Sequence, residues 1–406
     1  MAKVGTEWMK SRRLLASLLA ALLVTACGGG GGGETAANEA ASAAADPEVQ
    51  EAAAQIAAPG GDAAAAVAAT ETMRSAQHAQ GVHDRVRQVV VFGDSLSDVG
   101  TYRVGTIAQV GGGKFTTNPG PVWPETIGLL LNARVKPFRQ GFAGTSQILG
   151  GTGYAMGGSR VSQQPGIACN PDAQTGACTA ALTIPVTEQI SDYFAFNNDR
   201  FTANQLIFVL AGANDIFFQL GVFQANVQGG MKVEDAQALA LGGVQQAAVD
   251  LLGQVQRIVA KGGKRVVVLT VPEIADTPFG KAPDTAPVRP LIAGMVQLFN
   301  GVLAQGLANS GVHLLDIHAE FKRVTTNPGA YHVREINVPG CDAAKIAAIT
   351  EGLETGGSSL FCSRHTLVQI QAPFTYLFAD GVHPTTLGHL IFARFVLIEV
   401  WKRGLL

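Results

Sequence analysis

Two segments of the 406-residue chain place a serine and a histidine where acyl-transfer chemistry would need them. Gly93-Asp94-Ser95-Leu96 follows the apolar run 89–92. A serine that ends a buried strand and opens a helix exposes its hydroxyl, which suits a nucleophile, and leaves its backbone N–H free to bind an oxyanion. A helix-capping serine is the structural alternative, and this segment alone does not decide between the two.

The second segment is Asp380-Gly381-Val382-His383-Pro384, near the C-terminus. A serine hydroxyl needs an adjacent base, and a histidine that is oriented by a carboxylate can serve as that base. A spacing of three residues on one turn predicts that the side chains of Asp380 and His383 lie on the same side of the loop. A polar start to the last helix is the structural alternative.

Two further segments offer hydrogen-bond donors to a developing oxyanion. Asn214, in Gly212-Ala213-Asn214-Asp215, follows the apolar run 206–210. Side-chain amides serve as oxyanion donors, and losing one typically raises the barrier by about 3–4 kcal/mol. The segment 153–159 (GYAMGGS) is rich in glycine, which lets a backbone N–H approach an anion closely. Taken singly, these two segments also fit a turn and a flexible loop.

The elements that must position these residues follow from the apolar pattern. Continuous apolar runs predict strands that are buried on both faces, at 89–92, 206–210, 266–269 and 312–317. Apolar positions at helical spacing predict helices over 233–261, 287–309 and 385–401. Alternating strands and helices predict a parallel sheet in one α/β domain, from about residue 86 to residue 406. Ligands bind at the carboxyl ends of such strands, where Ser95 and Asn214 lie.

The N-terminus predicts export. Basic residues precede the apolar stretch 14–24, which is too short to span a membrane but fits the core of a signal peptide. The stretch ends in Val24-Thr25-Ala26-Cys27, which resembles a lipobox, so we expect residues 1–26 to be removed and Cys27 to carry lipid. An ordinary signal peptide with a chance cysteine is the alternative. Gly28, by resemblance to Gram-negative lipoproteins, favours the outer membrane, on a face that the sequence does not specify.

Residues 27–85 predict a tether between this anchor and the domain. A run of glycines is followed by an Ala-rich stretch that has no apolar face to bury.

The net charge of −2 and the pI near 6.4 give no electrostatic support for binding nucleic acid. No feature of the sequence indicates an obligate protein partner.

The other four cysteines predict disulfide bonds, because an even number in an exported chain is typical of them. Three pairings are possible, and we favour the local ones, Cys169–Cys178 and Cys341–Cys362, which close two short loops. A zinc site is the alternative, but the spacing fits no metal finger and no histidine cluster accompanies it. The irregular segments 144–185 and 325–375 carry these cysteines, and we expect both segments to lie over the active edge of the sheet.

Together the four segments resemble the GDSL, or SGNH, hydrolase family. VVVFGDSLSDVG, GTGYAMGGSRV, LAGANDIF and FADGVHPTTLGH are similar to four of its sequence blocks. The resemblance covers residues 88 to about 400 and implies a three-layer α/β/α sandwich around a parallel sheet, of flavodoxin-like type. It implies Ser95 as nucleophile, His383 as base and Asp380 as the orienting carboxylate. No metal or organic cofactor is implied.

By the same resemblance, the backbone N–H groups of Ser95 and Gly158 and the amide of Asn214 would bind the oxyanion. The block that contains Gly158 departs from the family pattern at Gly153, where asparagine is usual. Gly157 is the alternative donor, and we choose Gly158. Asp94 and Asp98 are interpreted as structural hydrogen-bonding residues. No motif supports a role for five other histidines: His313, His318, His332, His365 and His389.

An acyl ester is the expected substrate, of lipid or short-to-medium acyl type. Aromatic residues near the motifs would line an apolar groove or, more commonly, belong to the core: Phe115, Trp123, Phe142, Tyr154, Phe217, Phe218 and Phe223. A carbohydrate O-acetyl esterase of the same family is one alternative. A non-catalytic surface-binding lipoprotein is another, but it would not need all five site residues. The expected partners are the ester and, through Cys27, a membrane.

Overall fold

A computed structural model describes residues 86–406 of the chain. The predicted signal peptide (1–26) and tether (27–85), with Cys27, lie outside the described residues. A parallel sheet has the strand order β1-β4-β5-β6. Its strands are β1 (Gln88–Gly93), β4 (Gln205–Leu210), β5 (Arg265–Leu269) and β6 (His313–Leu315). Thr152 and Tyr154 exchange backbone hydrogen bonds with Val91, which extends the sheet beyond β1.

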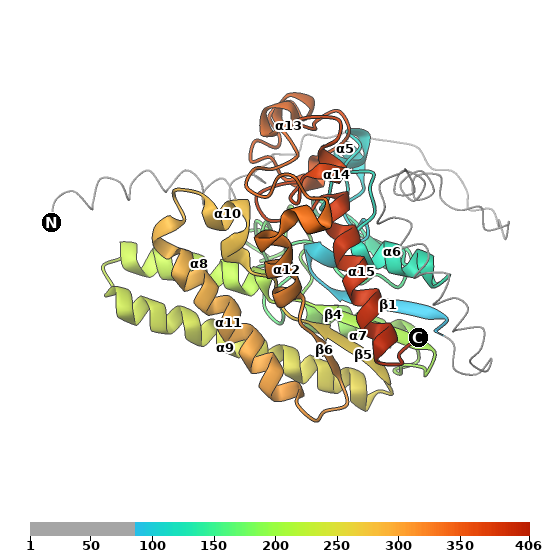
Figure 1. Ribbon diagram of the computed structural model, residues 1–406. Helices are drawn as coiled ribbons and strands as arrows, with labels where there is room; N and C mark the ends of the chain where they lie inside the picture. Colours follow the sequence, from blue (N-terminus) through green and yellow to red (C-terminus); the bar gives the residue numbers. More distant parts are fainter. Residues whose placement is uncertain (1–85) are drawn as a thin grey trace.

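Side chains alternate between the two faces of this sheet, and both faces are buried. Val90 and Phe92 pack into one core cluster, and Val89 and Val91 into another. The first cluster contains side chains from α7 (Val186–Phe196), α8 (Ala213–Gln228), α9 (Val233–Ala260) and α11 (Arg289–Leu307). The second contains side chains from α6 (Trp123–Leu130) and α15 (Thr386–Lys402). The result is the predicted three-layer α/β/α arrangement (Figure 1).

The strands and long helices predicted from periodicity are confirmed, with small differences at their ends. β6 is shorter than the predicted 312–317, because the carboxylate of Asp316 caps α12 (Ile317–Thr326) by accepting from the Ala319 N–H. Leu239 and Val259 fit the apolar spacing of α9 but are partly exposed to solvent.

Helix α11 is apolar enough, by length and composition, to cross a membrane. Its Ile292, Met295 and Phe299 are nevertheless fully buried in the first core cluster, as in the core helix of a globular domain.

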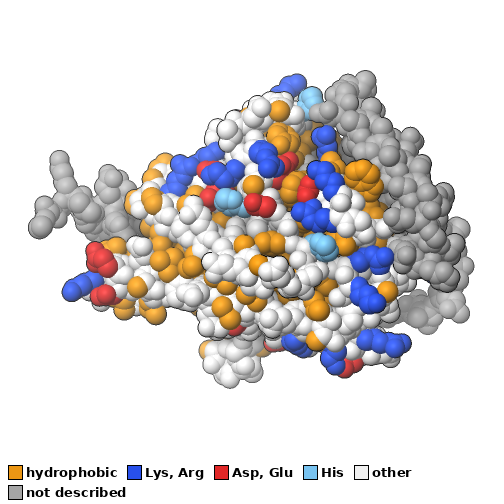
Figure 2. Space-filling view, turned by 60° about the horizontal axis from the view of Figure 1, so that its bottom comes forward, with side chains coloured by type: hydrophobic (Ala, Val, Ile, Leu, Met, Phe, Trp, Pro, Cys, Tyr) orange, Lys and Arg blue, Asp and Glu red, His pale blue; other side chains and the backbone are white. Residues whose placement is uncertain are grey.

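The centre of the face in Figure 2 carries few charged side chains, and basic side chains gather nearer its edges.

Shorter elements complete the domain. The helices are α5 (Gly105–Gln109), α10 (Pro278–Lys281), α13 (Ala343–Ile349) and α14 (Ala372–Thr375), and β2 (Arg139–Gln140) pairs antiparallel with β3 (Gln147–Ile148). The 3₁₀ turns are η1 (Ser95–Ser97), η2 (Ile274–Asp276), η3 (Ala286–Val288), η4 (Pro328–Tyr331) and η5 (Ser359–Phe361).

Both predicted disulfides are present, Cys169–Cys178 and Cys341–Cys362. The irregular segments that contain them pack together, because Ala181, Cys341 and Leu360 share a cluster with Tyr102 and Phe115.

Candidate active site

Strands β1 and β4 bring two of the predicted site residues to the same edge of the sheet. Gly93 pairs with Leu210, so the two strands end side by side. A side chain at Gly93 would collide with the Leu210 carbonyl oxygen, at 2.0 Å, so the close approach requires glycine. After β1, Asp94 caps the turn η1, in which Ser95 is the first residue. After β4, Gly212 adopts φ +118° and starts α8, which carries Asn214.

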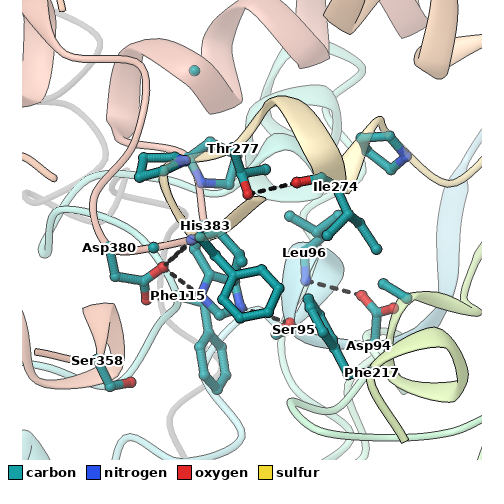
Figure 3. Close-up of a pocket in the computed structure, with 18 of the residues that line it drawn as sticks. Asp94, Ser95, Leu96, Phe115, Phe217, Ile274, Thr277, Ser358, Asp380 and His383 are labelled. Carbon is teal, nitrogen blue, oxygen red and sulfur yellow. Dashed lines mark hydrogen bonds and ion pairs between the residues drawn. The ribbon is translucent and has the colours of Figure 1, made fainter. Parts of the chain in front are cut away.

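The turn before α15 supplies Asp380 and His383. Oδ1 of Asp380 accepts hydrogen bonds from the backbone N–H groups of Val382 (2.9 Å) and His383 (2.7 Å), which closes the turn. Oδ2 of Asp380 lies 2.7 Å from Nδ1 of His383, and Nε2 of His383 lies 2.8 Å from Oγ of Ser95. Asp380, His383 and Ser95 therefore form one continuous hydrogen-bonded chain (Figure 3).

Electrostatics favour an ionised Asp380. Burial by itself would raise the pKa of this carboxyl. The charge of His383, with hydrogen bonds from His383 and Ser359, outweighs burial and holds the pKa of Asp380 well below its usual value. The Ser359 N–H lies 2.8 Å from Oδ2. Asp380 is thus a carboxylate that can orient the imidazole of His383 and stabilise its cation.

The three predicted oxyanion donors, Ser95, Gly158 and Asn214, line one cavity. The N–H of Gly157 donates to Asp98 Oδ2 at 2.8 Å, whereas no hydrogen bond of the described residues uses the N–H of Gly158. This arrangement favours Gly158 over Gly157. Gly158 has φ +78°, and a Cβ there would lie 2.2 Å from the Ile167 carbonyl oxygen, so this position also requires glycine.

The cavity beside Ser95 has a volume of about 780 Å³ and a largely apolar wall. Phe115 and Phe217 line it, and the Phe115 ring lies 4.9 Å from the His383 ring, between centroids. Figure 3 shows Phe217 and Ile274 on the side of Ser95 away from Asp380. Of the other aromatic residues considered, Trp123, Tyr154 and Phe223 belong to the core, Phe142 packs against it, and Phe218 lies against Arg160.

Several buried polar residues around this site have no sequence signature. Gln189 of α7 accepts from the N–H of Gly93 (2.9 Å) and donates to its carbonyl (2.8 Å) and to that of Ile184 (2.9 Å). A single glutamine in an amphipathic helix gives no signal for this role. His389, for which no motif supports a role, is fully buried, and burial lowers its pKa to about 3, so its imidazole is neutral.

Two buried carboxyl groups near the site favour the protonated state. Burial raises the pKa of Asp94 to about 7, although the charge of His383 and the N–H of Leu96 oppose the increase. Burial, with the charge of Asp380 adding to it, raises the pKa of Glu354 to about 7. Among residues 86–406, no group of three His, Cys, Asp or Glu side chains could hold a metal ion.

Replacing Glu354 with glutamine should make the protein relatively more stable at higher pH. Because the folded-state pKa of Glu354 is raised from 4.5 to about 7, the stability that its protonated form provides is full below about pH 4.5 and is lost as pH rises to about 7. Glutamine copies the protonated form at every pH. We expect the difference in unfolding free energy, Glu354→Gln minus wild type, to increase between about pH 5 and pH 8 by at most roughly 3 kcal/mol. Thermal unfolding at both pH values measures it, and a constant difference would contradict it.

The hydrogen-bonded chain and the sheet beneath it define an α/β protein with a serine–histidine–aspartate site, an arrangement that recurs in acyl-transferring hydrolases of unrelated folds. A family model described as GDSL-like lipase/acylhydrolase matches residues 89–396. The chain belongs to this family of hydrolases, as the sequence blocks predicted.

Two curated relatives are similar to parts of the chain. The anther-specific proline-rich protein APG of Brassica napus is 31% identical over 140 residues, which cover 33% of this chain and 29% of the relative. An uncharacterized protein in the trpE-trpG intergenic region of Pseudomonas putida is 27% identical over 350 residues, 78% of this chain and 50% of the relative. The chain thus spans half or less of each. Among solved structures, an extracellular lipase from Streptomyces rimosus is 16% identical, with a TM-score of 0.37, over 77% of this chain and 98% of the lipase.

Proposed function

We propose that the chain is a serine ester hydrolase that cleaves carboxylic acyl esters through an acyl-enzyme. The observation that carries the proposal is the hydrogen-bonded chain from Asp380 through His383 to Ser95, at the wall of an apolar cavity. Such a chain provides a nucleophile, a base and an orienting carboxylate in their required order.

In this mechanism Oγ of Ser95 attacks the ester carbonyl while Nε2 of His383 accepts its proton. The negative charge moves to the carbonyl oxygen, which the N–H groups of Ser95 and Gly158 and the amide of Asn214 bind. His383 then protonates the departing alcohol as the C–O bond breaks, which leaves Ser95 acylated. Water, deprotonated by His383, attacks the acyl carbon, and return of the proton to Ser95 releases the acid.

The apolar wall of the cavity supports acyl chains longer than acetyl. Phe115, Phe217 and Ile274 face this cavity and would bury methylene groups, each worth about 0.8 kcal/mol. An enzyme that removes only acetyl groups from carbohydrate would gain nothing from this surface. The two alternatives, an O-acetyl esterase and a non-catalytic lipoprotein, predict different results in the ester assay that follows.

We expect the full chain to hydrolyse p-nitrophenyl esters with a peak in kcat/KM above C2. Phe217→Ala should lower kcat/KM for C8 and longer esters by about 10-fold or more while changing C2 little, because it removes apolar contact from the cavity wall. Phe196→Ala is the matched control, since Phe196 is 56% exposed and does not line the cavity. A profile that peaks at C2 and is unaffected at Phe217 would support the acetyl esterase. No hydrolysis by folded protein would support the binding role.

We also propose that Cys27 is lipidated and holds the domain at the outer membrane. The lipobox-like sequence before Cys27 and the Gly/Ala-rich stretch after it support this proposal. Cys27→Ser should move the protein from the membrane fraction to the soluble fraction of cells in which the wild type is membrane-bound. Equal membrane association of the two chains would refute the anchor.

A further inference from the structure

A buried ion pair links the two segments that carry the predicted oxyanion donors Gly158 and Asn214. Nε of Arg160 lies 3.2 Å from Oδ1 of Asp215, and the two side chains are only 4% and 2% exposed. Asp215 directly follows Asn214, and Arg160 lies two residues after Gly158. Oδ2 of Asp215 also accepts from the N–H of Val161 at 3.0 Å. The ion-pair side chains thus join the start of α8 to the glycine-containing loop without lining the cavity.

The same loop aims the amide of Asn214. Nδ2 of Asn214 donates one hydrogen to the carbonyl of Ser159 at 2.8 Å. Because an amide nitrogen carries two hydrogens, this bond leaves the second one for the cavity that Asn214 lines. Ser159 lies between Gly158 and Arg160, so the position of its carbonyl depends on the segment that the ion pair holds.

A buried ion pair of this kind is not by itself evidence of added stability. A buried ion pair loses hydration that its mutual attraction recovers only in part, and apolar replacements of similar volume are often equally stable. Burial in fact raises the pKa of Asp215 to about 6 despite the adjacent guanidinium. Arg160 is fixed further by Phe218, whose ring centroid lies 3.8 Å from Cζ, and by Gln163. The result is a rigid connection between two backbone segments.

We propose that Arg160 and Asp215 are positioning residues that hold Gly158 and Asn214 at the relative positions needed to bind the oxyanion. This inference rests on the proposed esterase function and adds two residues to it. Neither touches the substrate; both act through the placement of the donors. Misplaced donors weaken transition-state binding without changing ground-state binding, so the loss falls on kcat and leaves KM unchanged.

The test replaces both charges at once, in Arg160→Met/Asp215→Asn, so that no unpaired charge is buried. Methionine keeps contact with Phe218, and asparagine still accepts from the Val161 N–H. We expect kcat to fall about 10-fold or more, with KM and the circular-dichroism spectrum unchanged. Arg139→Met/Asp192→Asn is the matched control, because that ion pair joins the start of β2 to α7 and lines no part of the cavity. It should keep wild-type kcat.

A double-mutant cycle with Asn214→Ala separates positioning from a merely structural role. If the pair acts through the donors, its effect on kcat shrinks at least about threefold when Asn214 is already absent. Equal losses in both backgrounds, or wild-type kcat in the pair variant, would overturn the inference.

If the pair variant does not fold, Arg160→Lys provides the same cycle, since lysine keeps the charge but lacks the planar fork. Failure of the inference is distinct from failure of the esterase function. If the esterase function itself is wrong, neither the wild type nor the Arg139→Met/Asp192→Asn control will show ester hydrolysis that depends on Ser95.

Discussion

Ser95→Ala is expected to lower kcat for ester hydrolysis by at least about 10⁴-fold, because removing the nucleophile of a catalytic triad leaves only the catalysis of the remaining site. The fold should persist, because among residues 86–406 the Oγ of Ser95 forms a hydrogen bond only with His383. Stopped or continuous p-nitrophenyl ester assays measure kcat, and thermal unfolding measures stability. Hydrolysis at the wild-type rate by the variant would refute the assignment of Ser95 as nucleophile.

The same turn supplies a matched control for this experiment. Ser97 is fully buried two residues after Ser95, and its hydroxyl has no hydrogen-bond partner among the described residues. Ser97→Ala should therefore retain activity and bind a fluorophosphonate covalently, whereas Ser95→Ala should not react. Labelling of the Ser95 variant at the wild-type rate would place the reactive serine elsewhere.

Two kinds of feature could be predicted from the sequence: apolar patterns that repeat along the chain, and contacts between residues that are only a few positions apart. Val89–Phe92 is apolar at every position because both faces of the sheet are covered, and this pattern distinguishes a central strand. Asp380 and His383 are three residues apart, so one turn is enough to bring their side chains together. The meeting of Ser95 with His383, 288 residues apart, required the family resemblance in addition to the strand pattern.

The parts that could not be predicted depend on contacts between distant segments that no local pattern marks. Gln189 joins the end of β1 to Ile184 through one amide, and its position in α7 looks like any other polar position of an amphipathic helix. Glu354 lies in an irregular loop, where a carboxylate is expected to be exposed; the fold buries it completely. The pairing of Arg160 with Asp215 spans 55 residues, and only the folded chain shows that the two neighbours of the predicted donors meet.

Asp380→Asn should lower kcat by roughly 10⁴-fold while leaving the backbone of the turn in place. The N–H groups of Val382 and His383 both donate to Oδ1, so the carbonyl oxygen of the new asparagine must take that position. Its NH₂ group then replaces Oδ2 and faces Nδ1 of His383, to which it can only donate. A histidine that accepts at Nδ1 carries its proton on Nε2, and Nε2 can no longer accept the proton of Ser95.

Asp380→Glu distinguishes this tautomer effect from simple loss of the turn, because glutamate keeps an acceptor for Nδ1 but displaces the carboxylate. We expect the Glu variant to be impaired yet clearly more active than the Asn variant in the p-nitrophenyl ester assay, with Ser95 still labelled by a fluorophosphonate. In the Asn variant the N–H of Ser359 would also face an NH₂ group, so a decrease in melting temperature should accompany the loss of activity. Wild-type kcat in Asp380→Asn would mean that His383 does not depend on this carboxylate for its tautomer, and the proposed triad would lose its third member.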